Sequence, residues 1–286
     1  RIREKQSPID KKNYYLIQDI KDIDFWIKEA EEVGEVAVDT ETNSLDPHQA
    51  ELVGISLSSK IGKACYIPLG HKSKKNVSKN LVLEKLKPLL EDSSVKKIGQ
   101  NIKFDFIIFF KQGIELTSME DTMLMSYVLD AGKNRHNMDT LSKIHLDHKT
   151  IAFKDLVGTG KKEINFSEVD VEKAKDYAAE DADITFRLYQ KFKKNLKVEK
   201  LNNIYEIFEK PMIKILAYME IEGIKIDNKF LKFLSSKFEK KIEKIQKQVF
   251  EISKKEFNIA SPKQLGEIIY NNLKIANLKK TKKGGF

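Results

Sequence analysis

Residues 37–46 are AVDTETNSLD, and this stretch continues the apolar segment VGEVAV that begins at residue 33. The alternation predicts a half-buried β-strand, on which Asp39 and Glu41 project to the same side because side chains two positions apart share a face. Two adjacent carboxylates raise each other's pKa and lower stability unless protons, cations or metal ions compensate their charge. The stretch therefore predicts a strand that ends at a site from which positive charge is missing.

The length and the composition indicate a two-part protein. At 286 residues the chain exceeds the roughly 100 to 200 residues of a typical domain, so two units are expected. No apolar run approaches the ~20 residues of a membrane span, so no membrane contact is expected. The single cysteine, Cys65, excludes an internal disulfide and a multi-cysteine zinc site. The chain begins RIREKQ without a methionine, so we expect it to be a piece of a longer protein.

The net charge of +9 is concentrated in the last third of the chain. Residues 1–190 contain 29 Lys and Arg against 32 Asp and Glu, whereas residues 191–286 contain 23 against 11. A basic segment attached to a nearly neutral body favours a polyanionic partner such as nucleic acid. Lysine is frequent throughout, so biased base composition of the genome is an alternative explanation.

Strand and helix patterns alternate between residues 35 and 190, which predicts an α/β domain with a mixed sheet. The tail is helical throughout, with Asp227 and Ser261 as expected N-caps and Pro262 at the first helical position. The domain boundary is expected near residues 192–200. The expected strands are EVAVDTE, LVGISLSS, KACYIPLG, KKIG and ELT, and the expected helices before the tail are LVLEKLKPLLED, NIKFDFIIFFKQG, MEDTMLMSYVLDAG, NMDTLSKIHL, IAFKDLVG and VEKAKDYAAEDADITFRLYQKFKKNL.

Two further stretches carry acids in unusual surroundings. Asp105 lies between Phe104 and Phe106 in an expected helix, where an unpaired carboxylate is costly. In YAAEDAD, Tyr177 and Asp181 are four positions apart and so share one helical face. Taken separately, each acid has an ordinary explanation as a turn cap, an ion pair or a surface hydrogen bond. Taken together with Asp39 and Glu41 on an α/β scaffold, they form the layout required by two-metal phosphoryl transfer.

The chemistry explains why these residues are carboxylates. Mg²⁺ prefers oxygen ligands and keeps several waters, so a few carboxylates and a substrate phosphate complete its shell. Two such ions about 4 Å apart activate the attacking water and stabilise the leaving oxygen. The positive charge missing beside Asp39 and Glu41 is therefore predicted to be a pair of divalent cations.

Five segments resemble, in order and spacing, the 3'-5' proofreading exonuclease domain of bacterial DNA polymerase I, a family A DNA polymerase. They are DTETNSLD, GQNIKFD, NRHNMDTLS, HKTIAFKDLVGTGKK and YAAEDADIT. In the tail, YEIFEKPMIKILAYMEIEGIKID, EFNIASPKQL and LKKTKKGGF look like the start of that enzyme's helical thumb. The resemblance covers nearly the whole chain. It implies a ribonuclease H-like mixed sheet flanked by helices in residues 1–195, followed by an all-helical, partial thumb in residues 196–286.

The resemblance also implies roles for single residues. Asp39, Glu41 and Asp181 match the ligands of the tighter metal ion. Asp39 also faces the second ion, which Asp105 helps to hold through its water shell. Tyr177 matches the tyrosine beside the nucleophilic water. The residues that match contacts to the DNA end are Leu45 and Phe153, as apolar wedges against the terminal bases, and Gln100, Asn101 and Arg135, as polar residues of the single-strand cleft.

The implied activity is 3'-5' hydrolysis of a single-stranded or frayed 3' end of DNA by a monomer, with two Mg²⁺ or Mn²⁺ ions, in a bacterial cytoplasm. The chain ends at Phe286, before the palm and fingers of this family. We therefore expect the missing palm and fingers of the same polypeptide as partners, and no polymerisation by the fragment alone. Two alternatives stay open: a free exoribonuclease with the same acids, and a catalytically idle scaffold whose nuclease fold supports the polymerase.

Overall fold

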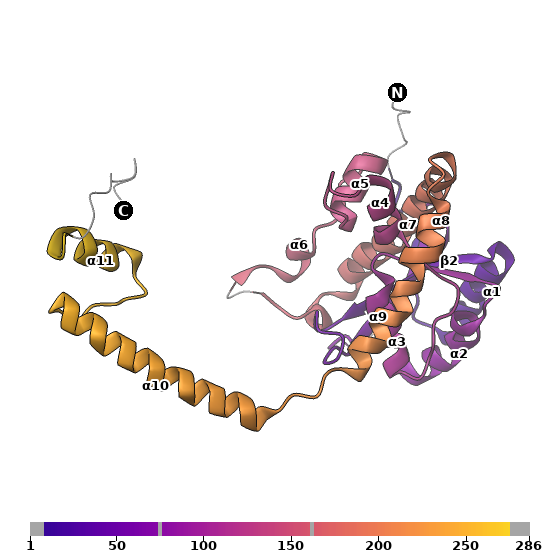
Figure 1. Cartoon of the computed structure of the whole chain (residues 1–286). Coiled ribbons are helices and arrows are strands. Elements are labelled where there is room, and N and C mark those ends of the chain that lie inside the picture. Colours follow the sequence, from indigo (N-terminus) through magenta and orange to yellow (C-terminus); the bar gives the residue numbers. More distant parts are fainter. Residues whose placement is uncertain (1–8, 74–75, 161–162, 275–286) are drawn as a thin grey trace. The chain divides into compact units, whose positions relative to one another are not determined.

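The computed structural model describes residues 9–73, 76–160 and 163–274 (Figure 1). The chain divides into two compact units, with the boundary between Gly223 and Ile224. The boundary near residue 195 that the sequence suggests lies inside the first unit, close to the end of its longest helix.

The first unit is built on one mixed sheet of six strands, which are β1 (Tyr14–Leu16), β2 (Glu35–Thr42), β3 (Leu52–Lys60), β4 (Lys63–Pro68), β5 (Lys96–Gly99) and β6 (Met119–Asp121). Their order in the sheet is β1-β4-β3-β2-β5-β6. β3 is antiparallel to both of its neighbours, whereas β2, β5 and β6 run parallel to one another. The expected mixed sheet is therefore confirmed.

Helices cover both faces of this sheet. The helices of the first unit are α1 (Ile23–Val33), α2 (Lys79–Glu91), α3 (Ile102–Lys111), α4 (Thr122–Asp130), α5 (Met138–Leu146), α6 (Phe153–Val157), α7 (Val171–Val198), α8 (Asn202–Ile204) and α9 (Lys210–Glu222), with the 3-10 turns η1 (Ile20–Asp22) and η3 (Phe166–Glu168) and the π-helical turn η4 (Tyr205–Glu209).

The alternation along β2 separates two hydrophobic cores. Val36 and Val38 are buried in the core that contains residues of α1, α2 and α3, whereas Ala37 between them is buried in the core that contains residues of α7. Because the side-chain period of a strand is two, Asp39 and Glu41 continue on the side of Ala37 and face α7. The apolar pattern of the strand thus decides which helix meets the two acids.

One expected strand was placed wrongly. The residues ELT, at 115–117, form no strand, and β6 begins just after them. Ser118 adopts a left-handed conformation (φ 46°), which turns the chain before β6 pairs with β5. The expected helix begins at Thr122 and not at Met119, because Asp121 caps α4 through its carboxylate, which accepts hydrogen bonds from two backbone N–H groups of the first turn.

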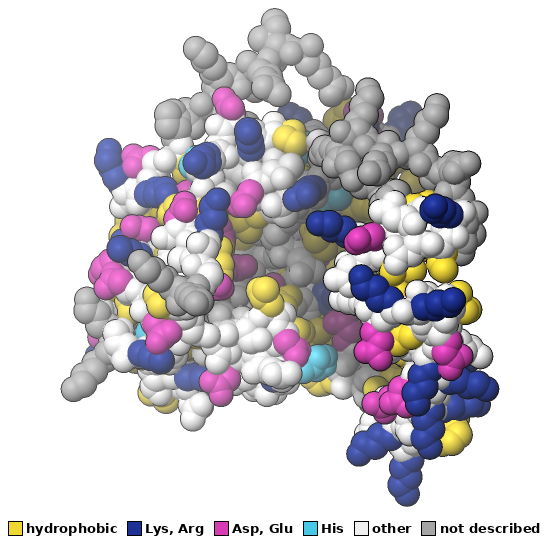
Figure 2. All heavy atoms as spheres, turned by 90° about the vertical axis from the view of Figure 1, so that its left-hand side faces the viewer, with side chains coloured by type: hydrophobic (Ala, Val, Ile, Leu, Met, Phe, Trp, Pro, Cys, Tyr) yellow, Lys and Arg dark blue, Asp and Glu magenta, His cyan; other side chains and the backbone are white. Residues whose placement is uncertain are grey.

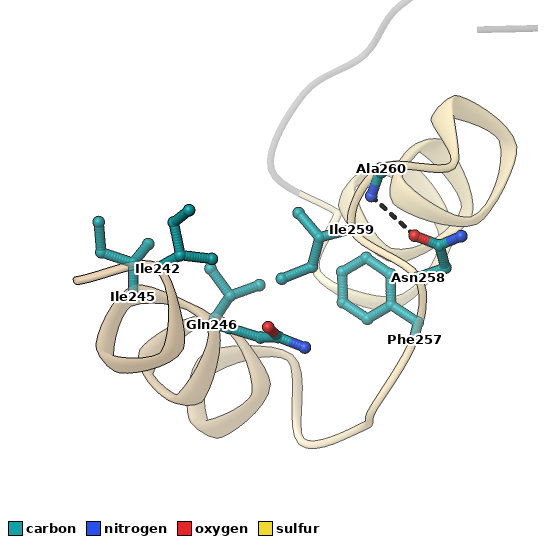
Figure 3. Close-up of a pocket in the computed structure, with 8 residues that line it drawn as sticks. Ile242, Ile245, Gln246, Phe257, Asn258, Ile259 and Ala260 are labelled. Atoms are coloured by element: carbon teal, nitrogen blue, oxygen red, sulfur yellow. Dashed lines mark hydrogen bonds between the residues drawn. The ribbon is translucent and has the colours of Figure 1, made fainter. Parts of the chain in front are cut away.

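The second unit is helical and contains α10 (Asn228–Ser253), α11 (Pro262–Gly266) and the π-helical turn η5 (Glu267–Asn272). The expected caps are confirmed, because the side chains of Asp227 and Ser261 accept hydrogen bonds from backbone N–H groups at the starts of α10 and α11. Beyond α10, Phe257 and Ile259 line a small apolar hollow together with Ile242 (Figure 3). This unit therefore has a local cluster of its own.

Both apolar and lysine side chains of α10 are exposed to solvent. Lysines along the helix are exposed, and Phe233, Phe238 and Ile242 are also more than half exposed. Acidic and basic side chains intermix over much of the face in Figure 2. The segment LKKTKKGGF, residues 278–286, lies outside the described residues. No helix in the described parts of the chain combines the length and the apolar character needed to cross a membrane.

Candidate active site

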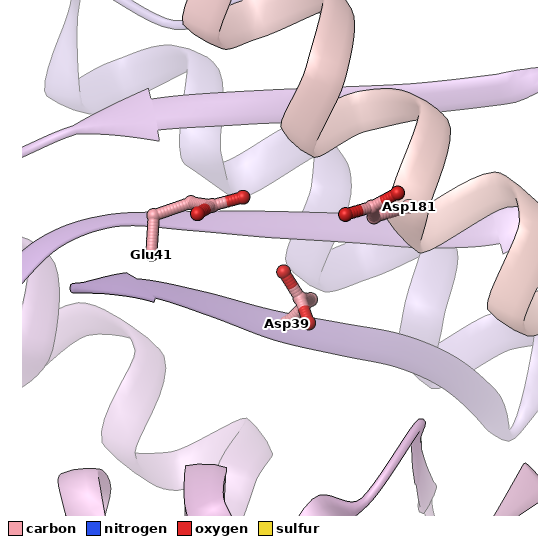
Figure 4. A group of neighbouring side chains, drawn as sticks. All are labelled: Asp39, Glu41 and Asp181. Carbon is pink, nitrogen blue, oxygen red and sulfur yellow. The ribbon is translucent and has the colours of Figure 1, made fainter. Parts of the chain in front are cut away.

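Three carboxylates meet between β2 and α7. Asp39 and Glu41 leave β2 on the side that faces α7, and Asp181 comes from that helix (Figure 4). Each of them offers an oxygen, and these oxygens lie within 4.8 Å of one another. The two elements meet because α7 packs across β2, β3 and β4. We call these three residues the acidic cluster.

Burial makes the acidic cluster electrostatically unfavourable. It raises the pKa of Asp39 to about 6. The pKa of Glu41 lies well above its usual value, because of burial first and then of the charges of the neighbouring acids. Burial and the charge of Asp39 raise the pKa of Asp181 as well, although a hydrogen bond from Tyr177 offsets part of that rise. Without cations, the cluster must hold protons or lower the stability of the fold.

The donor set of the acidic cluster fits a hard divalent cation. Its atoms are carboxylate oxygens, which Mg²⁺ and Mn²⁺ prefer. Oε1 of Glu41 is buried and has no hydrogen-bond partner in the part of the chain that the structure describes, and a buried unsatisfied oxygen is costly. None of the described residues that line the surrounding cleft is a lysine or an arginine. A bound cation would satisfy this oxygen and supply the missing charge.

Asp105 lies beside the acidic cluster but is held from the other face of β2. It is not among the described residues whose ligand atoms lie within 4.8 Å of one another. Its Oδ1 accepts hydrogen bonds from the backbone N–H (2.9 Å) and the hydroxyl (2.6 Å) of Thr40. Thr40 faces α3 because it alternates with the two acids along the strand. An indirect contact of Asp105 to a metal ion stays a prediction.

The acidic cluster opens into a cleft of about 550 Å³ with an aromatic wall. The ring of Phe153 stacks on that of Phe166, with centroids 6.1 Å apart and planes inclined by 9°. Tyr177 contacts both rings at 6.1 Å. Leu45 also lines the cleft and is 92% exposed, and Phe153 is 44% exposed. Exposed apolar and aromatic surface beside carboxylates can stack against the flat face of a base.

Three predicted cleft residues are not among the described residues that line this cleft. The amide of Gln100 is engaged at both ends, because Nε2 donates to the carbonyl of His136 (2.7 Å) and Oε1 accepts from the hydroxyl of Thr122 (2.5 Å). Asn101 is exposed in a left-handed conformation at the start of α3, and Arg135 is exposed as well. Contacts of these three side chains to a strand stay predictions.

Other residues that line the cleft were not predicted from the sequence. Phe104, Asn165 and Phe166 belong to it. Asn165 donates to the carbonyl of Asn43, just after β2 (2.8 Å), and forms a capping box with Glu168. The segment NFSE has the spacing of such a capping box, and this was the one signal that could have located η3 and the aromatic ring it carries.

In the metal-free protein, we expect the free energy of unfolding to fall as the pH rises from about 4 to about 6. The folded protein keeps a proton on Asp39 up to a pKa of about 6, whereas the unfolded chain releases it near a pKa of about 3.9. The folded state therefore binds more protons in this window, and the stabilisation is lost as the pH rises through it. Chemical unfolding in EDTA across this range measures the effect. Asp39→Asn is the matched control, since subtracting its pH profile from that of the wild type removes the contributions of titrating groups distant from the acidic cluster.

Mg²⁺ at neutral pH is expected to reverse this loss. The stabilisation is about 2.7 kcal/mol at a free concentration of 100 times Kd. The same unfolding experiment, repeated with Mg²⁺ or Mn²⁺, measures it. Identical pH profiles for the wild type and Asp39→Asn, or no stabilisation by either cation, would contradict the description of the acidic cluster as an uncompensated metal site.

Comparisons with known proteins identify the family and agree with the fold. A family model described as 3'-5' exonuclease matches residues 14–197, and one described as DNA polymerase family A matches residues 228–286. The chain is 41% identical to DNA polymerase I of Rhizobium leguminosarum, over 97% of this chain and 29% of that protein. It is 38% identical to DNA polymerase I of Pseudomonas aeruginosa, over 98% of this chain and 32% of that protein. The chain thus spans about a third of the length of these relatives or less.

Solved structures show the same architecture at lower identity. The polymerase domain of Pol1 from M. smegmatis, in complex with DNA primer-template and dNTP, matches 95% of this chain and 43% of its own, with a TM-score of 0.74 and 19% identity. Brucella melitensis NrnC with bound Mg²⁺ matches 69% of this chain and 91% of its own, with a TM-score of 0.52 and 24% identity. These matches support the fold, a mixed sheet flanked by helices.

Proposed function

The chain belongs to the family of 3'-5' exonuclease domains found in DNA polymerase I, and on this premise we propose that it hydrolyses the 3'-terminal nucleotides of DNA by a two-metal-ion mechanism. The observation that carries the proposal is the acidic cluster of Asp39, Glu41 and Asp181, whose oxygens lie within 4.8 Å of one another. Its position beside an exposed aromatic wall supports a substrate with bases.

The acidic cluster would hold one Mg²⁺ or Mn²⁺ ion. Asp39 would also reach a second ion, which Asp105 would help to hold through water, since Thr40 already occupies one of the Asp105 oxygens. When bound, the two ions supply an activated water and stabilise the leaving oxygen of the phosphodiester. The contribution of the chain itself is to fix these carboxylates on a strand and a helix that pack directly against each other.

Tyr177 would orient the attacking water. Its hydroxyl lies beside Asp181, one helical turn along α7, and its pKa is raised by burial first and then by the charges of the neighbouring acids. The phenol therefore stays protonated at neutral pH, so its O–H can donate to Asp181 while its oxygen accepts a hydrogen bond from a water. In this position it would hold the nucleophile in line with the scissile bond.

Leu45 and Phe153 would contact the terminal bases. Stacking on apolar and aromatic side chains tolerates any base, as required of an enzyme that removes mismatches of every kind. A mismatched end frays more cheaply than a paired one, which gives selectivity without reading the base. Gln100, Asn101 and Arg135 would contact the single strand as polar residues of its cleft.

The remaining parts of a polymerase would lie elsewhere in the same polypeptide. Residues 228–286 match the DNA polymerase family A model. By sequence we place the nuclease domain in residues 1–195 and a partial thumb in residues 196–286, and residues 199–223 of this thumb segment pack in the compact unit of the nuclease domain. The palm and fingers would complete a bacterial, cytoplasmic enzyme that acts as a monomer on primer-template DNA.

Digestion of a DNA primer with a 3' mismatch and a label at its 5' end tests the proposal. A ladder of progressively shorter labelled products with Mg²⁺, and none with EDTA, is expected. Faster digestion of an RNA end of the same sequence would favour a free exoribonuclease. No digestion, together with no binding of divalent cations by the folded protein, would favour an idle scaffold.

Tyr177→Phe is expected to slow digestion by only roughly 10- to 150-fold, since one hydrogen bond to a charged group contributes roughly 1.5–3 kcal/mol and the metal ions would still generate the nucleophile. The phenylalanine ring keeps its contacts with Phe153 and Phe166. Tyr177→Ala is the control and should also weaken substrate binding, because it removes the ring. If Tyr177→Phe lowered the digestion rate as much as a substitution in the acidic cluster, the hydroxyl would have a larger role than orienting the water.

A further inference from the structure

Glu180 precedes Asp181 in α7 but makes its contacts away from the acidic cluster. Its side chain is fully buried, with 0% exposure. Its Oε1 lies 2.9 Å from Nε2 of His148 and 2.9 Å from Nζ of Lys11. Its Oε2 accepts a hydrogen bond from the backbone N–H of Ile151 at 2.6 Å. Both oxygens of this buried carboxylate are therefore in use.

Two of these contacts belong to the segment that joins α5 to α6. His148 and Ile151 lie in this segment, and Phe153 is the first residue of α6, two positions after Ile151. Other hydrogen bonds tie the segment back to α5, including that of the Thr150 hydroxyl to Asp139 (2.7 Å). Glu180 connects it to α7, the helix that carries Tyr177.

We propose that Glu180 is a positioning residue for the nuclease site. By tying residues 148–151 to α7, it holds Phe153 against Phe166 and Tyr177 at the cleft. The inference rests on the proposed function, in which Phe153 contacts the terminal bases. The helix α7 would then supply three parts of the site: Asp181 as a metal ligand, Tyr177 one turn before it to orient the water, and Glu180, next to Asp181, to anchor the aromatic wall.

The physical need for an anchor follows from the exposure of Phe153. This side chain is 44% exposed, so the hydrophobic core does not fix it. Charge-assisted hydrogen bonds to a buried carboxylate are short and strong, and they hold the backbone of Ile151 as well as the His148 ring. A shift of about 1 Å in a substrate-contacting group is enough to cost a large factor in turnover or binding.

Glu180→Met tests the proposal, because methionine keeps the length of the side chain but accepts no comparable hydrogen bonds. With a single-stranded oligodeoxynucleotide and Mg²⁺, we expect KM to rise on the order of tenfold, as for loss of a stacking contact. The values of kcat and of the Kd for Mn²⁺ should change little. Glu180→Gln should restore most of the affinity, because its amide oxygen can still accept the N–H of Ile151.

Lys11→Met is the matched control. It removes a contact to the same carboxylate, from a side chain that is 38% exposed, and leaves both bonds to the 148–151 segment in place. Its KM should equal that of the wild type. A rise in KM equal to that of Glu180→Met would overturn the proposal, because it would assign the effect to the charge of Glu180 and not to the segment it holds.

A double-mutant cycle with Phe153→Ala separates positioning from a general structural role. Phe153→Ala should raise KM by itself, and adding Glu180→Met should then raise it no further, since the side chain being positioned is gone. Additive effects on KM would overturn the proposal, because sites that act independently add. If Glu180→Met does not fold, His148→Ala replaces it in the cycle.

Hydrogen exchange of the Ile151 amide tests the anchor without reference to activity. The amide should be protected in the wild type and lose protection in Glu180→Met or His148→Ala. Unchanged protection would overturn the proposal even if the enzyme is active. If the wild type degrades no DNA, the proposed function fails, and the exchange measurement still decides whether Glu180 holds the segment.

Discussion

Replacing Asp39 with asparagine is expected to lower the rate of DNA hydrolysis by at least about 10³-fold, since the ions that it would hold supply several kcal/mol of transition-state stabilisation and ~1.4 kcal/mol corresponds to a factor of ten. Asp39 is the acid that the proposed arrangement shares between both metal ions. Single-turnover digestion of a 5'-labelled primer with a 3' mismatch, at saturating Mg²⁺, measures the effect on chemistry directly.

The same substitution is expected to leave the fold intact and to raise the melting temperature of the metal-free protein. Removing one of three crowded carboxylates relieves repulsion that burial strengthens. Asp176→Asn is the control for activity, because Asp176 lies on α7 near the site but is an exposed partner of Lys175. It should leave the rate unchanged.

Asp183 provides the opposite case on the same helix. This carboxylate is also buried, but it is compensated by Arg187 (3.0 Å), by the hydroxyl of Tyr14 (2.8 Å) and by the N–H of Gly62 (2.7 Å). Asp183→Asn should therefore destabilise the protein, with or without metal. A large loss of thermal stability in metal-free Asp39→Asn would place Asp39 in the same class as Asp183 and count against the metal site.

Local periodicity was enough to place each part of the acidic cluster. The period of two puts Asp39 and Glu41 on one side of β2, and the helical period puts Tyr177 and Asp181 on one side of α7. Neither period predicts that the strand and the helix pack against each other. We inferred this from the order of the motifs, which resembles that of a known family.

The parts that could not be predicted depend on contacts between distant segments. Glu180 stood inside a quoted motif, but its partners are a loop and a residue near the N-terminus, which no periodicity connects to it. The strand β1 has only three residues, too few for a pattern, and is fixed by pairing with β4. Phe166 became part of the cleft through ring contacts across the fold. The partners of Glu180 and the place of β1 leave no local signal in the sequence, and for Phe166 the capping-box spacing of NFSE marks only the turn that carries it.

The end of the nuclease unit also differs from the sequence-based expectation, because the compact unit continues past α7 to Gly223. Ending the chain at residue 198 is expected to destabilise the nuclease unit strongly, whereas ending it at residue 223 should leave that unit intact. Tyr205 is fully buried, and Ile213 and Ala217 of α9 are buried in the core that contains α3. Loss of a buried aromatic side chain alone costs roughly 3–5 kcal/mol, out of a total stability of roughly 5–15 kcal/mol.

Polar contacts add to this packing. The hydroxyl of Tyr205 accepts the backbone N–H of Asp121 (2.9 Å), and the carboxylate of Asp121 in turn accepts the backbone N–H groups of Asn101 and Ile102 (both 3.1 Å). These two N–H groups are at the start of α3, the helix that carries Asp105. Removing residues 199–223 would therefore leave a buried N–H unpaired and loosen the helix behind the proposed metal site.

Chemical unfolding of the two shortened chains measures the difference, and Tyr205→Ala in the full chain gives the share of one side chain. Equal stabilities would mean that residues 199–223 only rest on the nuclease unit and that it ends near residue 195. The expected outcome has a functional consequence, because α9 is then part of the nuclease fold and not only a connection to the helices that follow. Its contacts with α3, through Tyr218 against Phe106 and Phe110, would make any displacement of α9 also a displacement of the helix that holds Asp105.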